Sequence, residues 1–65
     1  MDRVFRLKLD LPFLRKGNLY SFDDEIGWVY RCNDDGSRFE YPLREGLSKY
    51  LWLLKSENDK YLKEV

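Results

Sequence analysis

The segment from Gly27 to Tyr41 limits the possible folds most strongly, because it has the pattern of a β-hairpin closed by Asp35-Gly36. Asp-Gly favours a two-residue turn in which both central residues have positive φ, and such a turn sets the register of the two strands. The alternative is a four-residue loop from Asn33 to Gly36. That loop is disfavoured because it places Arg31 opposite Arg38, a like-charge pair.

The two-residue turn gives the predicted hairpin one aromatic face and one charged face. Side chains alternate along a strand, so the first face carries Trp28, Tyr30, Cys32, Phe39 and Tyr41. The second face carries Val29, Arg31, Arg38 and Glu40. In this register Cys32 faces Phe39, Tyr30 faces Tyr41 and Arg31 pairs with Glu40. We therefore expect a half-buried sheet with Cys32 packed in its core.

The residues before the hairpin indicate two more strands. Apolar and charged residues alternate strictly from Val4 to Leu11, which is typical of a half-buried strand. Pro12 ends this strand or marks a sheet edge, and Lys16-Gly17-Asn18 is a turn signal. Leu19 to Phe22 forms a short second strand. The sequence predicts an antiparallel meander of about four strands, with curling toward a small barrel left open.

After Pro42 the spacing of apolar residues changes to the period of a helix. From Leu43 onward eight apolar residues fall within an arc of roughly 120°, and only Trp52 and Leu53 lie off it, so we expect a helix over residues 43–55 that packs on the sheet. A capping pattern, Ser56 with Asp59, predicts a second short helix. The competing interpretation makes 50–54 a buried strand, 56–59 a turn and 60–64 a last strand. It gains support from Gly46, which costs about 1 kcal/mol inside a helix.

Size and composition favour one small folded domain spanning residues 1–65. A chain of 65 residues is near the lower limit for a single core, so help from a partner subunit is expected. Twelve basic residues balance twelve acidic ones, which gives no overall attraction for nucleic acid or an anionic membrane. A single cysteine excludes an internal disulfide and suits a reducing cytoplasm. No apolar run has the roughly 20 residues that a membrane-spanning helix needs.

Residue types with catalytic chemistry are scarce. The chain has no histidine, which removes the commonest general base and the commonest zinc ligand. Cys32 lies on the aromatic face, where burial disfavours the thiolate. The acidic clusters 23–25 and 33–35 do not have the spacing of a calcium loop. We therefore expect no enzyme activity, no metal and no cofactor.

Two adjacent residues of the predicted helix are candidates for a protein interface. Trp52 and Leu53 lie outside the apolar arc, and an exposed Trp beside Leu is typical of a binding anchor. The alternative is that the sheet covers them. The acidic loop of Asp23, Asp24 and Glu25 is a second interface candidate, and a homodimer that buries Trp52 is a specific expectation.

A basic strand face supports a different class of function. Arg6, Lys8, Arg15 and Lys16 would form a small nucleic-acid-binding surface. This alternative is weaker because the aromatic residues that could stack on bases are also needed for the core.

Three parts of the chain resemble small uncharacterised proteins of bacteriophages and prophages. They are DLPFL (10–14) followed by KG (16–17), then GWVY (27–30), then YPLREGL (41–47) running into YLWLLK (50–55). The resemblance implies a phage product acting in the bacterial cytoplasm or the virion. It carries no site residues. We expect a non-enzymatic protein-binding module, such as a phage-encoded inhibitor of a host or defence protein or an accessory factor, with a minor virion or assembly protein as an alternative.

Overall fold

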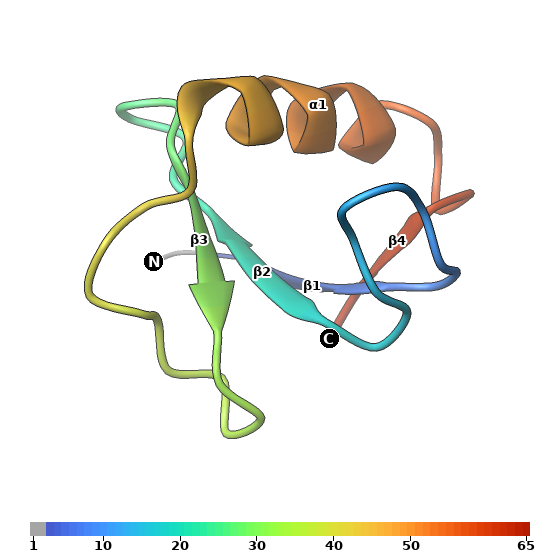
Figure 1. Cartoon of the computed structure of the whole chain (residues 1–65), viewed down its shortest axis with the longest axis horizontal. Helices are drawn as coiled ribbons and strands as arrows, with labels where there is room; N and C mark the ends of the chain where they lie inside the picture. Colours follow the sequence, from blue (N-terminus) through green and yellow to red (C-terminus); the bar gives the residue numbers. More distant parts are fainter. Residues whose placement is uncertain (1–2) are drawn as a thin grey trace.

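The computed structural model describes residues 3–65 as an open antiparallel sheet with one helix across it (Figure 1). The strands are β1 (Arg3–Leu7), β2 (Leu19–Phe22), β3 (Val29–Cys32) and β4 (Leu62–Glu64), and the helix is α1 (Glu45–Lys55). The order across the sheet is β3-β2-β1-β4, so the first and last strands are neighbours. The predicted α+β architecture is confirmed, and the sheet does not close into a barrel.

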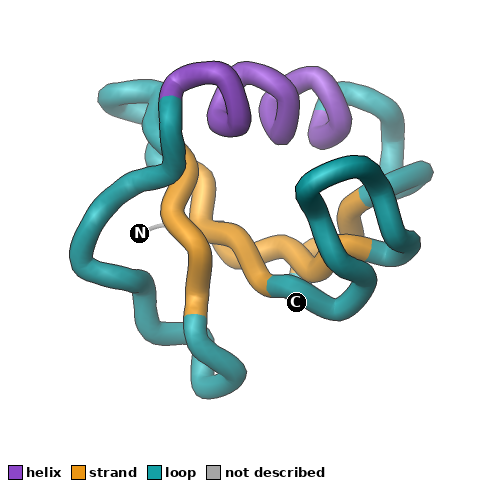
Figure 2. The backbone as a smooth tube through the Cα atoms, in the orientation of Figure 1, coloured by secondary structure: helices purple, strands orange, loops and turns teal. Residues whose placement is uncertain are grey.

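The core lies between α1 and the sheet face beneath it (Figure 2). Because Phe5 pairs with Tyr20, and Phe22 with Val29, the alternation of side chains brings these residues to one face. Phe5 and Phe22 meet edge to face with ring centroids 5.3 Å apart. The buried cluster consists of Phe5, Leu7, Leu14, Tyr20, Phe22, Val29, Leu51, Leu54 and Leu62.

The predicted hairpin forms, but its register and the length of its second strand differ from the prediction. β3 forms as expected, but only the isolated bridge between Cys32 and Arg38 continues the pairing. The amide of Gly36 donates to the carbonyl of Asn33, and Gly36 has a φ of +90°. This is a turn followed by one left-handed glycine, which makes a three-residue loop closed by the bond from Asn33 N–H to the carbonyl of Ser37.

Side-chain hydrogen bonds stabilise this three-residue loop. The Asp35 carboxylate accepts from both the amide and the hydroxyl of Ser37, at 2.9 and 2.6 Å. The pairing is therefore one residue away from each of the two registers weighed from the sequence, and a shift of one residue reverses the faces. Arg31 lies opposite Phe39 instead of Glu40, and Phe39 and Tyr41 are exposed. Cys32 is buried, as predicted.

After α1 the chain follows the competing interpretation, in which residues 56–59 form a turn and residues 60–64 a last strand. The predicted helix over 43–55 is confirmed as α1, but the second short helix is wrong, and so is the alternative strand at 50–54. Asn58 and Asp59 both have positive φ, at 44° and 61°, which stops helix propagation. The chain turns and enters β4, which completes the sheet at the edge of β1.

β1 is shorter than its alternating sequence predicts. It ends at Leu7 instead of Leu11. At Leu7 the amide donates to the carbonyl of Asn18, and the carbonyl accepts from the amide of Gly17. Gly17 has a φ of +92°, so the predicted turn at 16–18 is confirmed. The residues in between form a loop that rises from the sheet toward α1 (Figure 1).

Candidate protein interface

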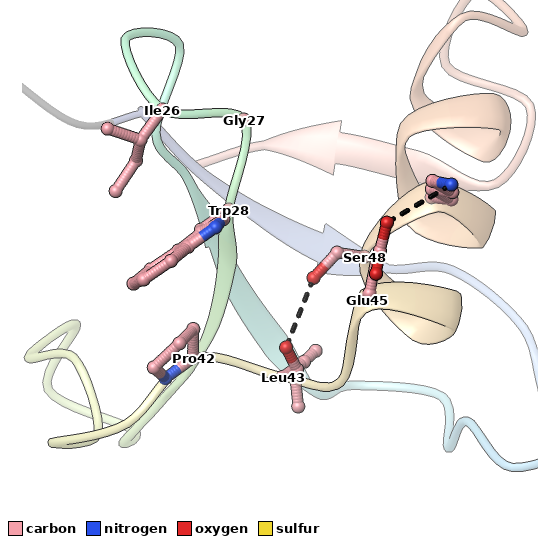
Figure 3. Close-up of a pocket in the computed structure, with 8 residues that line it drawn as sticks. Ile26, Gly27, Trp28, Pro42, Leu43, Glu45 and Ser48 are labelled. Atoms are coloured by element: carbon pink, nitrogen blue, oxygen red, sulfur yellow. Dashed lines mark hydrogen bonds and ion pairs between the residues drawn. The ribbon is translucent and has the colours of Figure 1, made fainter.

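One wall of α1 borders a groove of about 440 Å³. Figure 3 shows Ile26, Trp28 and Pro42 in a row on one side of it, with helix residues on the other. About half of the surface of Ile26 and of Trp28 is exposed, 53% and 50%. Glu45 and Lys49, which also line the groove, form an ion pair at 3.2 Å. The groove therefore has an apolar wall with charged groups at its rim.

The two predicted anchors on α1 have different environments. Leu53 is 67% exposed, on the outer side of the helix. Trp52 is only partly exposed, and the expectation that it points away from the core is wrong. Its ring meets Phe22 edge to face with centroids 5.0 Å apart, and its indole N–H donates to the carbonyl of Gly27 at 2.9 Å. One side of Trp52 still borders a shallow apolar depression with Leu53.

Among residues 3–65, Phe13 is the most exposed large apolar side chain, at 93%. It follows Pro12 in a tight turn that is closed by hydrogen bonds of 2.9 and 3.0 Å between Leu11 and Leu14. Phe13 has a φ of +67°, and this position of the turn favours Gly or Asn. Buried Leu14 anchors the turn in the core. The loop therefore holds the aromatic side chain of Phe13 in solvent, while Leu14 fixes the loop to the core.

Phe13 borders the opposite wall of α1. It lines a depression of about 390 Å³ together with Arg44, Gly46 and Leu47. Exposed apolar side chains thus flank the helix on both sides, Phe13 on one and Ile26 with Trp28 on the other. We call this surface, with Gly46, Lys49 and Leu53 along the helix between the flanks, the α1 face.

The acidic loop is partly structural. One carboxylate oxygen of Asp23 accepts from the amides of Glu25 and Ile26 at 3.0 and 3.4 Å, and the other lies 3.9 Å from Arg38. Asp24 and Glu25 are exposed at the tip, directly before Ile26. The loop therefore places two exposed carboxylates next to Ile26, which lines the groove beside α1.

Three of the four predicted basic residues lie away from the α1 face. Arg6, Lys8 and Lys16 come together with Lys63 around a groove of about 300 Å³, whereas Arg15 does not line it. Lys63 belongs to β4 and is paired directly with Arg6. The side chains that line this groove include no aromatic ring.

Perturbed carboxylates lie outside these grooves. Hydrogen bonds from Ser37 lower the pKa of Asp35, and hydrogen bonds from Arg3 lower the pKa of Glu64. Both shifts favour the ionised carboxylate, which suits an acceptor in a surface contact. Residues 3–65 contain no cluster of three or more His, Cys, Asp or Glu side chains placed to hold a metal ion.

Sequence reasoning missed Phe13, Ile26 and Trp28 as surface residues. Trp28 was assigned with Tyr30 and Cys32 to the buried face of its strand, but the opposite face of β3, which carries Val29, packs in the core. The exposure of Phe13 was predictable, because a large apolar residue directly after the proline of a turn cannot easily reach the core. The flanking position of these residues depends on loop geometry that no local pattern encodes.

No helix within the described part of the chain combines the length and apolar content that crossing a bilayer requires. Comparisons of the chain with family models, with curated proteins and with solved structures found no match.

Proposed function

We propose that this chain is a non-enzymatic protein-binding module and that the α1 face is its interface. The observation that carries the proposal is the grouping of exposed Phe13, Trp28 and Leu53 around one helix. Exposed aromatic and large aliphatic side chains that gather on one face are typical of binding anchors. The charged residues at the edges resemble the polar rim of an interface.

In this proposal Trp52 supports the interface from within and does not contact the partner directly. Its ring packs on Phe22 and its N–H holds Gly27, so it positions the loop that carries Ile26 and Trp28. Leu53 is the direct contact residue in this proposal. Asp24 and Glu25 contribute charge at the rim, while Asp23 shapes the loop.

The resemblance to small phage proteins supports a specific biological setting within this proposal. The segments at residues 10–17, 27–30 and 41–55 resemble phage proteins, and we propose a role as an inhibitor or accessory factor that acts on a protein in the bacterial cytoplasm. A minor assembly role in the virion is the alternative within the same class.

The test uses two matched substitutions of exposed apolar residues. Leu53 on the α1 face and Val65 beside β4 are similarly exposed, at 67% and 62%. Tagged wild-type protein and the variants Leu53→Glu and Val65→Glu are compared for protein capture from bacterial extract and for self-association. We expect Leu53→Glu to lose binding and Val65→Glu to retain it. Equal binding by all three folded proteins would refute the α1 face as the interface.

The groove between β1 and β4 favours a second candidate function, nucleic-acid binding. Arg6 and Lys63 are like charges directly opposite one another, an arrangement that destabilises a sheet unless an anion offsets it. Binding of single-stranded DNA should then weaken steeply with salt and be lost in Arg6→Glu. Absence of binding at low salt would remove this candidate.

A further inference from the structure

The groove between β1 and β4 gathers positive charge from three parts of the chain. Its volume is about 300 Å³. Four cationic side chains line it: Arg6 of β1, Lys8 directly after β1, Lys16 of the turn before β2, and Lys63 of β4. Among the described residues that line the groove there is no Asp or Glu. The groove is therefore strongly basic, although the formal net charge of the whole chain is +0.

The backbone brings two of these cations together against their mutual repulsion. Arg6 and Lys63 are direct partners in the pairing of β1 with β4. Phe5 and Leu7 on either side of Arg6 pack in the core beneath α1, so Arg6 and Lys63 lie on the opposite face of the sheet, where both are exposed. Directly opposed residues of an antiparallel pair have β-carbons about 5 Å apart, and like charges there are destabilising. The docking of β4 therefore carries an electrostatic cost.

Most of the charge in the groove has no counterion within the chain. Among residues 3–65, the side chains of Arg6, Lys16 and Lys63 form no hydrogen bond and no ion pair. Lys8 differs, because its ammonium donates to the carbonyl oxygen of Asp59 in the turn before β4. This bond holds the charge of Lys8 at the groove. Three cations are therefore available to an anion, and a fourth is fixed beside them.

We propose that this groove binds a compact polyphosphate anion and that the bound anion fastens β4 to β1. A phosphate group between Arg6 and Lys63 replaces their repulsion by two attractions, and the planar guanidinium binds two phosphate oxygens at once. The inference rests on the second candidate function, because it names the ligand chemistry of the same groove. It is independent of the α1 face.

The lining of the groove favours a compact anion over a single nucleic-acid strand. Proteins that bind single strands combine a basic track with aromatic rings on which the bases stack. In this groove the cations surround one hollow, and the side chains that line it include no aromatic ring. The site therefore recognises phosphate groups by charge, and a free polyphosphate presents several of them within a short span.

The strand that gains most from a bound anion is β4. It has three residues and lies at the edge of the sheet, with β1 as its one neighbour among the described strands. Hydrogen bonds of 2.8 Å from the amide of Lys8 to Tyr61 and of 3.0 Å from the amide of Val65 to Val4 extend the pairing. Short edge elements open locally more often than a core does. An anion that needs both strands stabilises the closed state by mass action.

The first experiment measures hydrogen exchange of single amides by NMR, with sodium tripolyphosphate compared with sodium chloride at equal ionic strength. The amides of Lys8 and Val65 donate between β1 and β4, and tripolyphosphate should slow their exchange at least about tenfold. The amide of Asp23, which donates to Trp28 between β2 and β3, is the internal control and should change much less. Equal slowing of all three amides, or no slowing, would overturn the fastening of β4.

Two neutral substitutions locate the site by calorimetric titration with tripolyphosphate. Lys63→Gln removes a cation of the groove, whereas Arg15→Gln removes an exposed cation that does not line it. We expect Lys63→Gln to bind at least about tenfold more weakly, because a charge-assisted contact is lost, and Arg15→Gln to bind like wild type. Without the anion, Lys63→Gln should unfold at a higher temperature than wild type, since the repulsion from Arg6 is gone. Equal weakening by both substitutions would overturn the site.

A thymidine oligonucleotide at the same concentration of phosphate separates the two sources of this chemistry. Tripolyphosphate binding that Lys63→Gln loses supports the inference, whether or not the oligonucleotide binds. If the oligonucleotide binds and tripolyphosphate does not, the compact anion is overturned and the second candidate function stands. If neither binds at low salt, both fail, and the α1 face is still tested separately by Leu53→Glu.

Discussion

The indole N–H of Trp52 donates a hydrogen bond of 2.9 Å to the carbonyl oxygen of Gly27. Gly27 has a φ of +75°, and the loop between β2 and β3 bends there before entering β3. The bond therefore fastens this loop to α1, 25 residues further along the chain. The amine of Lys55 lies over the indole ring of Trp52, 5.1 Å from its centre, in a cation–π contact.

Trp52→Phe removes this hydrogen bond and keeps an aromatic ring against Phe22. We expect the free energy of unfolding to fall by about 1 kcal/mol, since a typical hydrogen bond contributes 0.5 to 1.5 kcal/mol. Urea denaturation followed by far-UV circular dichroism measures the change. Trp28→Phe is the control, because no hydrogen bond of its indole is formed within residues 3–65. Equal stability of Trp52→Phe and Trp28→Phe would contradict the role of the bond.

Phe13→Asn should stabilise the folded chain by about 1 kcal/mol. A residue with a β-carbon loses about 1 to 2 kcal/mol in the left-handed region, and Asn tolerates that region better than Phe. The side chain of Phe13 is exposed, so its replacement removes little packing. Phe13→Ala keeps the unfavourable φ and should show a smaller gain. If the two variants unfold at the same denaturant concentration, backbone strain at Phe13 is not the cause.

Ser21→Ala should leave the fold intact and raise its stability by about 1 kcal/mol. The Ser21 hydroxyl is completely buried and has no hydrogen-bond partner, which costs about 1 to 3 kcal/mol of desolvation. Ser48→Ala is the matched control, because the hydroxyl of Ser48 donates to the carbonyl of Leu43 at 3.4 Å. Thermal unfolding of both variants checks the difference. A loss of stability in Ser21→Ala would show that the hydroxyl is satisfied in solution.

The ion pair between Arg3 and Glu64 should make the free energy of unfolding depend on pH in the acidic range. Arg3 donates two hydrogen bonds of 2.8 Å to the Glu64 carboxylate, and they lower its pKa in the folded state. The stabilisation is therefore present above the pKa of Glu64 in the unfolded chain and is lost as the pH falls through the folded pKa.

Glu64→Gln checks this dependence. The difference in unfolding free energy between wild type and Glu64→Gln should shrink from neutral to strongly acidic pH. It should also shrink with added salt, because both side chains are about half exposed. A difference that stays constant with pH would rule out the ion pair as a source of stability.

The sequence predicted well those elements whose pattern comes from one local period. The alternation around Phe5 and Leu7 identified β1, and the helical spacing of Leu47, Leu51 and Leu54 identified α1. Both patterns exist because one side of each element faces the core. The predicted end of β1 was less accurate, because Leu9 and Leu11 continue the alternation after the strand has ended at Leu7.

The parts of the fold that were predicted wrongly depended on the backbone conformation of one or two residues in a turn. Gly36 alone adopts positive φ, where the two-residue turn required Asp35 to do so as well, and the strand pairing after the turn therefore differs by one residue from the prediction. Consecutive left-handed residues at Asn58 and Asp59 directed the chain into β4. The candidate interface was only partly predictable for the same reason. Leu53 follows from the helix, whereas Phe13 and Trp28 flank it through loop geometry.

The pairing of β4 with β1 has a consequence for the order of folding. Leu7 pairs with Leu62, so contacts within the sheet join residues near opposite ends of the described chain. A ribosome-bound nascent chain can form the β1–β2–β3 meander early, but Leu7 and Phe5 lack their outer neighbour until residues 62–64 have been synthesised. Such non-local pairing slows folding. During synthesis the edge of β1 stays open to other chains until β4, which follows the other described strands in sequence, pairs with it.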